Sequence, residues 1–143
     1  MYHYTECGLQ KVWLENGYSV TNTPYGKGIS IRDVAGLHRL IGRTIAYRPK
    51  LTGTELRFLR KEMELSQKGL AKMVGVTEQN VSLWERQGKI PRYASRLVKL
   101  LYLGHVEGNV KVIEIIQNFI DQDEDGQDNL RFRAQGGHWK EAA

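Results

Sequence analysis

The chain has 143 residues and a formal net charge of +5. Its 41% hydrophobic and 9% aromatic content suffices for a packed core, yet no apolar run approaches the roughly 20 residues that span a membrane. The N-terminus lacks the basic start and apolar run of a secretory signal, and the single cysteine, Cys7, excludes an internal disulfide. We therefore expect a cytoplasmic protein.

The charge is unevenly distributed along the chain. Residues 1–54 hold seven Lys and Arg against three acids, and residues 55–103 hold ten against five. Residues 104–143 hold four against eight. The first hundred residues are thus basic and the remainder is acidic. A basic body fits a polyanionic partner such as nucleic acid.

The first fifty residues have the composition of a small α+β module. Asn16-Gly17 stands between two β-prone runs and predicts a hairpin turn. Residues 23–28 then form a loop and residues 29–31 a third strand. Asp33 can cap a short helix whose apolar face consists of Val34, Leu37 and Ile41. Residues 44–47 return to a strand-like composition.

The spacing of residues 52–103 predicts four helices. Thr52 and Glu55 have capping-box spacing, Ser66 and Thr77 can cap the next two helices, and Pro91 stands where a fourth begins. The glycines that should end the second, third and fourth helices are Gly75, Gly88 and Gly104. The expected inward positions are Leu56, Leu59, Met63, Leu70, Ala71, Val74, Ala94, Leu97, Leu100 and Leu101.

Residues 109–120 predict one further, amphipathic helix. Its broad apolar face consists of Val112, Ile113, Ile116, Phe119 and Ile120. This face is our first candidate for a dimer interface and residues 1–50 are the second; alternatively, the face packs on its own chain. Residues 121–143 are acidic and then rich in Gly and Gln, which predicts a flexible tail.

The helical region contains a helix-turn-helix pattern. Two short helices meet at a tight turn at Gly75, and Val81 and Trp84 would hold the second of them against the core. The sequence LRFLRKEMELSQKGLAKMVGVTEQNVSLWERQGKIP, residues 56–91, resembles the Xre/Cro-type helix-turn-helix family. We thus predict a mainly α fold: an N-terminal module (1–50), a five-helix Xre/Cro-type domain with a C-terminal dimerisation helix (51–120) and a tail (121–143).

The resemblance implies DNA binding and assigns roles to individual residues. In that family the third helix lies in the major groove, here residues 77–87. The implied base-facing residues are Thr77, Glu78, Gln79 and Leu83. The implied backbone and flanking contacts are Ser66, Gln67, Lys68, Asn80, Arg86, Lys89 and Arg92. Glu85 matches a buried or semi-buried acid of the family, which implies a structural role for it.

The chemistry of these side chains agrees with the implied roles. Gln79 can pair with the N6 and N7 atoms of adenine, and Glu78 can accept from cytosine N4. Arg86, Lys89 and Arg92 supply attraction to phosphates. One helix-turn-helix covers about half a turn of duplex, so specificity needs two copies on a palindrome. We expect a homodimeric, sequence-specific repressor of a small operon, its own included, on a palindromic double-stranded DNA operator.

The N-terminal module, followed by LTGTELRFLRKEMELSQ, also resembles the MqsA-like antitoxins, which join a zinc module to an Xre-type domain. That zinc module carries two CxxC pairs. Here the four ligand positions fall on Tyr4, Cys7, Arg39 and Gly42, so three ligands are absent, and we expect no metal. The resemblance implies that residues 1–50 bind a partner protein such as a toxin, with a hairpin edge around residues 12–20.

Two alternatives to a DNA-binding regulator stay open. The module at residues 1–50 could make the chain mainly a protein-interaction module. The basic surface could bind RNA, with bases stacking on Tyr2, Tyr4, Tyr18, Tyr25 and Tyr47. The sequence contains no nucleophile elbow, phosphate-binding loop or HExxH motif, and the run at 121–128 lacks the final glutamate of a calcium loop. We therefore expect neither catalysis nor a cofactor.

Overall fold

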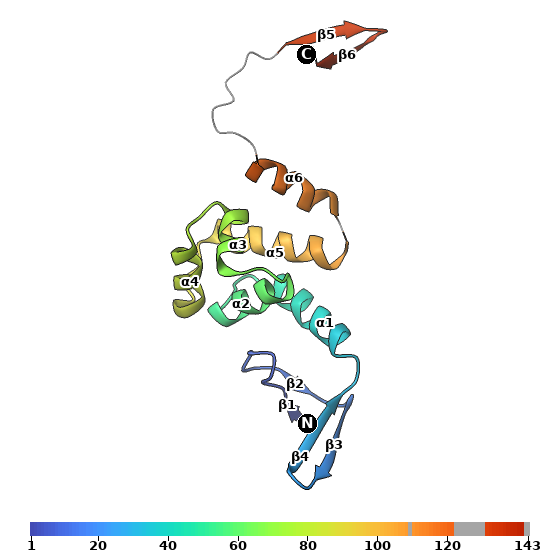
Figure 1. Ribbon diagram of the computed structural model, residues 1–143, viewed down its shortest axis with the longest axis vertical. Coiled ribbons are helices and arrows are strands. Elements are labelled where there is room, and N and C mark those ends of the chain that lie inside the picture. The colour runs from blue at the N-terminus through green and yellow to red at the C-terminus, as the bar shows by residue number, and fades with distance from the viewer. Residues whose placement is uncertain (109, 122–130, 142–143) are drawn as a thin grey trace.

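The computed structural model describes residues 1–108, 110–121 and 131–141 and is mainly helical (Figure 1). Its strands pair as three small antiparallel sheets within the described residues. The strands are β1 (Tyr2–His3), β2 (Trp13–Leu14), β3 (Tyr18–Thr23), β4 (Gly26–Ile31), β5 (Phe132–Gln135) and β6 (His138–Glu141). The helices are α1 (Val34–Ala46), α2 (Gly53–Glu62), α3 (Gln67–Val74), α4 (Glu78–Gln87), α5 (Arg92–Val106) and α6 (Val110–Asp121). The predicted fold class is confirmed.

The first four helices begin at the predicted capping residues. Asp33, Ser66 and Thr77 each accept a hydrogen bond from a backbone N–H in the first turn of the helix that follows. Thr52 and Glu55 form a capping box, because each side chain accepts from the backbone N–H of the other. Short-range chemistry therefore sets these helix starts.

Three predictions within the helices are wrong. Residues 44–46 belong to α1 rather than to a strand, because Ile45 is buried one turn after Ile41 and this burial outweighs the β propensity of the segment. The helix α5 continues past Gly104 to Val106, and Gly108 follows it in the left-handed conformation. Leu100 is 52% exposed, while Val98 and Tyr102 fill the core at that level.

The predicted hairpin turn at Asn16-Gly17 is also wrong. β2 pairs with β1, through Tyr2 opposite Leu14, and β3 pairs with β4. The hairpin turn is at residues 24–25, because Thr23 faces Gly26 across it. Most of the predicted loop 23–28 is therefore strand, and Gly17 turns the chain between the two sheets.

The N-terminal module and the helices share a single core. Leu56, Leu59 and Tyr102 are buried at its centre, and Tyr4 and Leu14 of the module belong to the same cluster. Gly42 of α1 is required here, since a Cβ at this position would overlap the Tyr102 ring. The module thus packs directly on the helical domain.

The C-terminal region differs from the predicted flexible tail. Residues 132–135 and 138–141 form an antiparallel hairpin, β5–β6, with Gly136 and Gly137 at its turn. The acidic run at residues 122–130 lies outside the described part of the chain. Within the described ranges, no helix combines the length and apolar character needed to cross a membrane.

Candidate nucleic-acid interface

The helix-turn-helix consists of α3 and α4. Gly75 adopts a left-handed backbone conformation after α3, with φ of 84°. Its N–H and that of Val76 both donate to the Ala71 carbonyl, which closes the turn. Val81 and Trp84, both buried, then hold α4 on the core. The opposite face of α4 is left for a ligand.

That opposite face holds the four residues predicted to contact bases. Thr77, Glu78 and Gln79 are exposed, and so is Leu83, one turn after Gln79. The Thr77 hydroxyl accepts from the Asn80 N–H as the helix cap, so its methyl group is the part left for an apolar contact. The structure therefore brings these four residues together on one face of α4, from its cap to its middle.

A buried ion pair fixes α4 against α2. Arg60 donates from Nε to Glu85 Oε2 at 2.7 Å and from Nη2 to Oε1 at 3.0 Å. Its Nη1 donates to the Leu65 carbonyl at 3.0 Å, and both side chains are at most 10% exposed. Glu85 thus has the structural role that we expected. Because α4 is held at this point, its outer face has a defined orientation.

The remaining predicted contacts surround this face. Gln67 is half-buried and its amide donates to Glu85 at 3.3 Å, so in this state its Nε2 is engaged within the domain. The Ser66 hydroxyl accepts from the Gly69 N–H. The exposed residues of the set are Ser66, Lys68, Asn80, Arg86, Lys89 and Arg92. Together they give α3, α4 and the start of α5 a mainly basic margin.

A cationic pocket of about 390 Å³ extends this margin. Lys50, Lys89, Arg92 and Arg96 line it, together with Ser95. Ser95 is 7% exposed, and its hydroxyl has no hydrogen-bond partner within the described ranges. No side chain caps α5, whose first N–H groups begin beside this pocket. Such a combination of cations, hydroxyl and helix N-terminus is suited to a phosphate.

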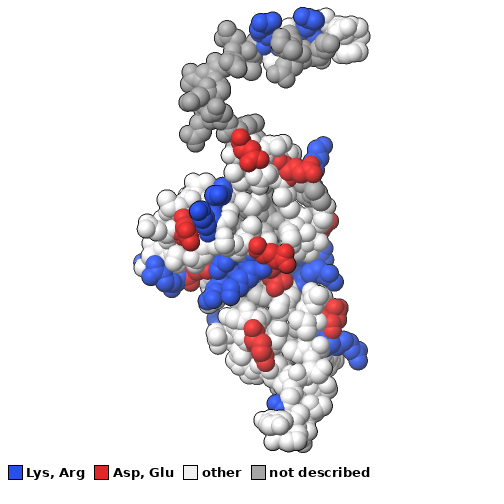
Figure 2. All heavy atoms as spheres, in the orientation of Figure 1, with Lys and Arg blue, Asp and Glu red and all other residues white. Residues whose placement is uncertain are grey.

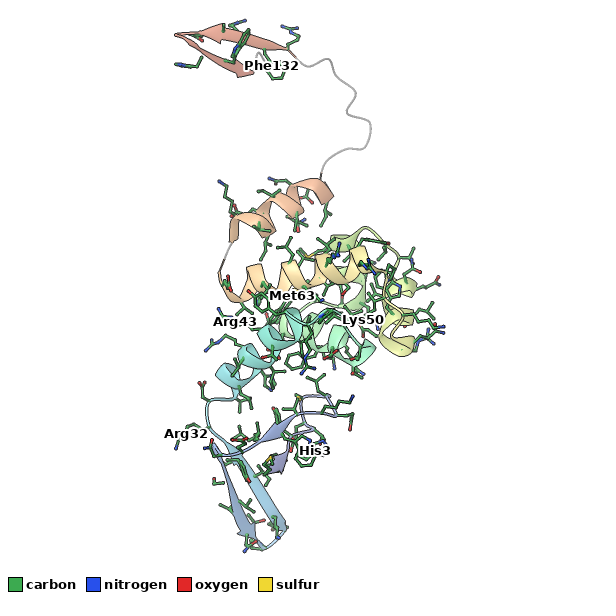
Figure 3. The ribbon with its side chains drawn as sticks, turned by 180° about the vertical axis from the view of Figure 1, so that it is seen from behind. His3, Arg32, Arg43, Lys50, Met63 and Phe132 are labelled. Carbon is green, nitrogen blue, oxygen red and sulfur yellow. The ribbon has the colours of Figure 1, made fainter. Side chains whose placement is uncertain are left out.

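Sequence reasoning missed three polar residues of this pocket, namely Lys50, Ser95 and Arg96. Arg96 lies one helical turn after Arg92 and could have been found from that spacing. Ser95 gave no signal, because a serine inside a helix is ordinary in sequence. Lys50 precedes α2, and the fold brings it to the start of α5. Figure 3 shows Lys50 beside the helices, whereas His3 and Arg32 lie in the strand module. Figure 2 shows Lys and Arg, with acidic side chains among them, gathered across the middle of one face.

The candidate dimer helix α6 packs partly on its own chain. It lies along α5 (Figure 1), and Ile116 contacts the core. Val112, Ile113 and Ile120 are half-buried, Ile115 is exposed, and the side chain of Phe119 lies outside the described set. Part of the apolar face is therefore used within the chain and part stays accessible.

The N-terminal module has a polar link where the zinc pattern would begin. The Tyr4 hydroxyl lies 2.7 Å from His38 Nε2, and His38 Nδ1 lies 2.9 Å from Glu62 Oε1. Burial raises the pKa of Tyr4, which is part of the core. In the described ranges, no three His, Cys, Asp or Glu residues cluster as metal ligands would. Both partners of His38 are far from it in the sequence, so a local pattern could not reveal this link.

The tyrosines considered for RNA stacking do not form one surface. Tyr4 is buried, and Tyr2 packs against Tyr18 with ring centroids 5.5 Å apart. Tyr25 stands fully exposed at the tip of the β3–β4 hairpin, and Tyr47 follows α1. A shared base-stacking platform is therefore wrong for this set. Likewise, residues 12–20 do not form one hairpin edge, because β2 and β3 belong to different sheets.

Comparison with known proteins identifies the helical domain. Residues 56–95 match the family model described as Helix-turn-helix, of the Xre/Cro type. The match covers less than a third of the chain. No curated protein and no solved structure matches the chain. The helix-turn-helix domain implies DNA binding, with DNA as a partner. None of these comparisons supports the resemblance to the MqsA-like antitoxins.

Proposed function

We propose that this protein is a sequence-specific, double-stranded DNA-binding transcriptional regulator that inserts α4 into the major groove. The observation that supports it most is the division of α4 into two faces. Val81 and Trp84 are buried, whereas Thr77, Glu78, Gln79 and Leu83 are exposed and adjacent. A helix held in this way presents hydrogen-bonding and apolar groups to base edges without rearrangement.

Selectivity and affinity come from different residues in this proposal. Gln79 pairs with adenine, Glu78 accepts from cytosine or repels a wrongly placed phosphate, and Leu83 contacts a thymine methyl group. The phosphate contacts come from Gln67 and from the basic margin, that is from Ser66, Lys68, Asn80, Arg86, Lys89 and Arg92, extended by Lys50 and Arg96. Since α4 carries an acid at its start, affinity depends mainly on that margin.

Two copies are needed for a site of useful length. We assign the dimer contact to the accessible part of α6, with the N-terminal module as the alternative. The dimer would read a palindromic operator and repress a small operon, its own included, in the cytoplasm without a cofactor or catalysis. This regulatory setting follows from the family resemblance of residues 56–91.

Footprinting on the DNA upstream of the protein's own gene tests the proposal. We expect a protected palindrome whose half-sites are one helical turn apart, or a multiple of it. Binding that is salt-sensitive but protects no defined sequence would contradict it. The dimer contact is tested by measuring the molecular mass in solution of the free and the DNA-bound protein. The variant for this measurement is Ile115→Glu, on the exposed side of α6.

A second candidate, binding of a partner protein by residues 1–50, is supported by the β3–β4 hairpin. Val20 and Ile29 face each other on one side of this ribbon and are both exposed, as is Tyr25 at its tip. Exposed apolar side chains on an uncovered ribbon suit strand addition by a partner. We expect the protein to co-purify with the product of a neighbouring gene, and Val20→Lys to abolish this co-purification. If that product leaves DNA binding unaltered, partner binding and DNA binding are separate roles of the chain.

A further inference from the structure

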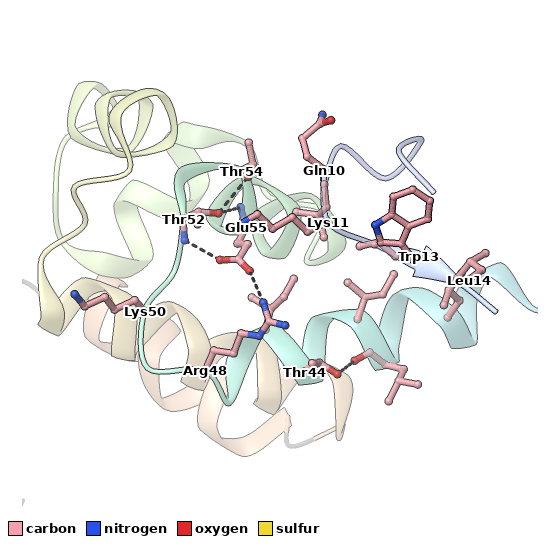
Figure 4. Close-up of a pocket in the computed structure, with 16 residues that line it drawn as sticks. Gln10, Lys11, Trp13, Leu14, Thr44, Arg48, Lys50, Thr52, Thr54 and Glu55 are labelled. Carbon is pink, nitrogen blue, oxygen red and sulfur yellow. Dashed lines mark hydrogen bonds and ion pairs between the residues drawn. The ribbon is translucent and has the colours of Figure 1, made fainter. Parts of the chain in front are cut away.

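A cavity of about 570 Å³ lies where the N-terminal module meets the helical domain. The segment at residues 9–14 forms one wall, α1 a second, and the start of α2 a third (Figure 4). Pockets for small molecules typically measure roughly 300–1,000 Å³ and lie at such junctions. The cavity is separate from the exposed face of α4.

The floor of this cavity is apolar. Six aliphatic side chains line it: Leu9, Val12, Leu14, Leu37, Ile41 and Ile45. Trp13 and Leu40 also line the cavity and are 57% and 63% exposed, although the Trp13 ring stacks on that of His3, so large apolar groups are partly exposed at its edge. Covering this surface would favour a ligand with an apolar body.

The polar groups of the cavity are mainly cationic. Lys11, Arg48 and Lys50 line it, against one carboxylate, that of Glu55. Glu55 is already satisfied, since its Oε1 accepts from the Thr52 N–H at 2.8 Å and its Oε2 lies 3.6 Å from Arg48. Lys11 and Lys50 form no ion pair within the described part of the chain. The uncompensated charge of the lining is therefore positive.

The Arg48–Glu55 contact leaves most of the guanidinium available. The Arg48 side chain is 60% exposed, and one of its nitrogens approaches the carboxylate. A guanidinium has five N–H donors in a planar fork that matches a carboxylate. In Figure 4 Arg48 extends into the space between α1 and the start of α2.

From these observations we propose that the cavity binds a small organic acid. Its apolar body would lie on the aliphatic floor beside Trp13, and its carboxylate would pair with Arg48 and Lys11. The ligand class is an aryl or acyl carboxylate, because the lining supplies a large apolar area together with two cations.

The position of the cavity connects it to the DNA-reading helix. Glu55 belongs to the capping box of α2, and α2 carries Arg60, which holds Glu85 of α4. A carboxylate that draws Arg48 away from Glu55 would act on the first turn of α2. Lys50 also lines the cationic pocket at the start of α5, so it belongs to both cavities. An effect of the acid on DNA affinity rests on the proposed function, whereas binding of the acid to the cavity does not.

The test measures binding to the full-length protein without DNA. The probes are 2-naphthoate and decanoate, and their neutral controls are 2-naphthamide and decanamide. Amide chemical shifts in NMR spectra should change in residues 9–14, 37–48 and 52–55, and at least one acid should bind about tenfold more tightly than its amide, about 1.4 kcal/mol. Lys11→Glu should remove this preference, whereas Lys27→Glu, on β4 outside the cavity, should retain it.

Several results would overturn the proposal. They are the absence of shift changes at millimolar concentrations of both acids, equal binding of each acid and its amide, and shift changes confined to another surface. Preserved preference for the acids in Lys11→Glu and in Arg48→Gln would also overturn it. If the acids bind as expected but leave DNA affinity unchanged, the site stands and its link to DNA binding fails.

Discussion

The helix-turn-helix domain and the N-terminal module are stabilised by different kinds of contact. In the domain, helices begin at caps a few residues away, and the long-range ion pair Arg60–Glu85 joins two helices within it. In the module, β1 and β2 have two residues each, and Tyr4 reaches through His38 to Glu62 of α2. Two-stranded sheets are marginal alone. The module therefore depends on the domain for its structure.

The largest expected effect tests the internal link of the domain. Glu85→Ala should lower the free energy of unfolding by about 3–5 kcal/mol, because it leaves the Arg60 charge buried and unpaired. Urea denaturation measures this value. In the matched control, Glu107→Ala, the loss should stay within about 0.5 kcal/mol, since the Arg43–Glu107 pair is half-exposed. Equal effects of the two substitutions would contradict the assignment.

A smaller effect is expected at the junction of module and domain. Gly42→Ala places a Cβ against the Tyr102 ring and should destabilise the protein by about 1–3 kcal/mol. Amide hydrogen exchange should show the largest loss of protection in α1 and the strands. Tyr102→Phe in the same chain should relieve part of the strain, because the hydroxyl oxygen is the nearest atom to the added Cβ. Uniform loss across all helices would show that the two regions are not distinct.

The smallest effect concerns the polar link of the module. Tyr4→Phe should cost about 1 kcal/mol at neutral pH, because it removes the hydrogen bond to His38. Tyr25→Phe, at a fully exposed position, should change nothing measurable.

The contribution of the same link to stability should decrease at alkaline pH. Burial raises the pKa of folded Tyr4 above the ordinary value of 10.0, so its contribution is complete below that value and is lost as pH rises through the raised pKa. The stability difference between the parent and Tyr4→Phe should therefore shrink above pH 10.0. A difference that grows there would contradict this account.

The helix-turn-helix domain and the N-terminal module also differ in how much of their structure could be predicted from the sequence. Thr52, Ser66, Thr77 and Gly75 act on neighbours within a few residues, so the sequence alone located the helix starts and the turn. The pairing of β1 with β2 and the role of His38 depend on residues far apart in the chain, which a local pattern cannot reveal. The strong hairpin signal at Asn16-Gly17 misled for this reason.

The candidate site shows the same limit. The exposed face of α4 was predictable, because Val81 and Trp84 fix which side of the helix is inward. Lys50 was not, since it comes from the segment before α2 and reaches the start of α5 through the fold. The Ser95 hydroxyl likewise gave no sequence signal, because only the fold shows that it is buried without a hydrogen-bond partner among the described residues.

One measurement tests most directly whether α4 reads bases while its margin supplies affinity. Binding to the footprinted operator, and to operators with single base-pair changes, is measured over a range of salt concentrations for the parent, Gln79→Ala and Arg92→Ala. Gln79→Ala should lose about 1–3 kcal/mol of discrimination at one base pair and keep the salt dependence. Arg92→Ala should weaken all operators alike and lower the salt slope by about 1. If both variants bind every operator as the parent does, α4 does not lie in the major groove as proposed.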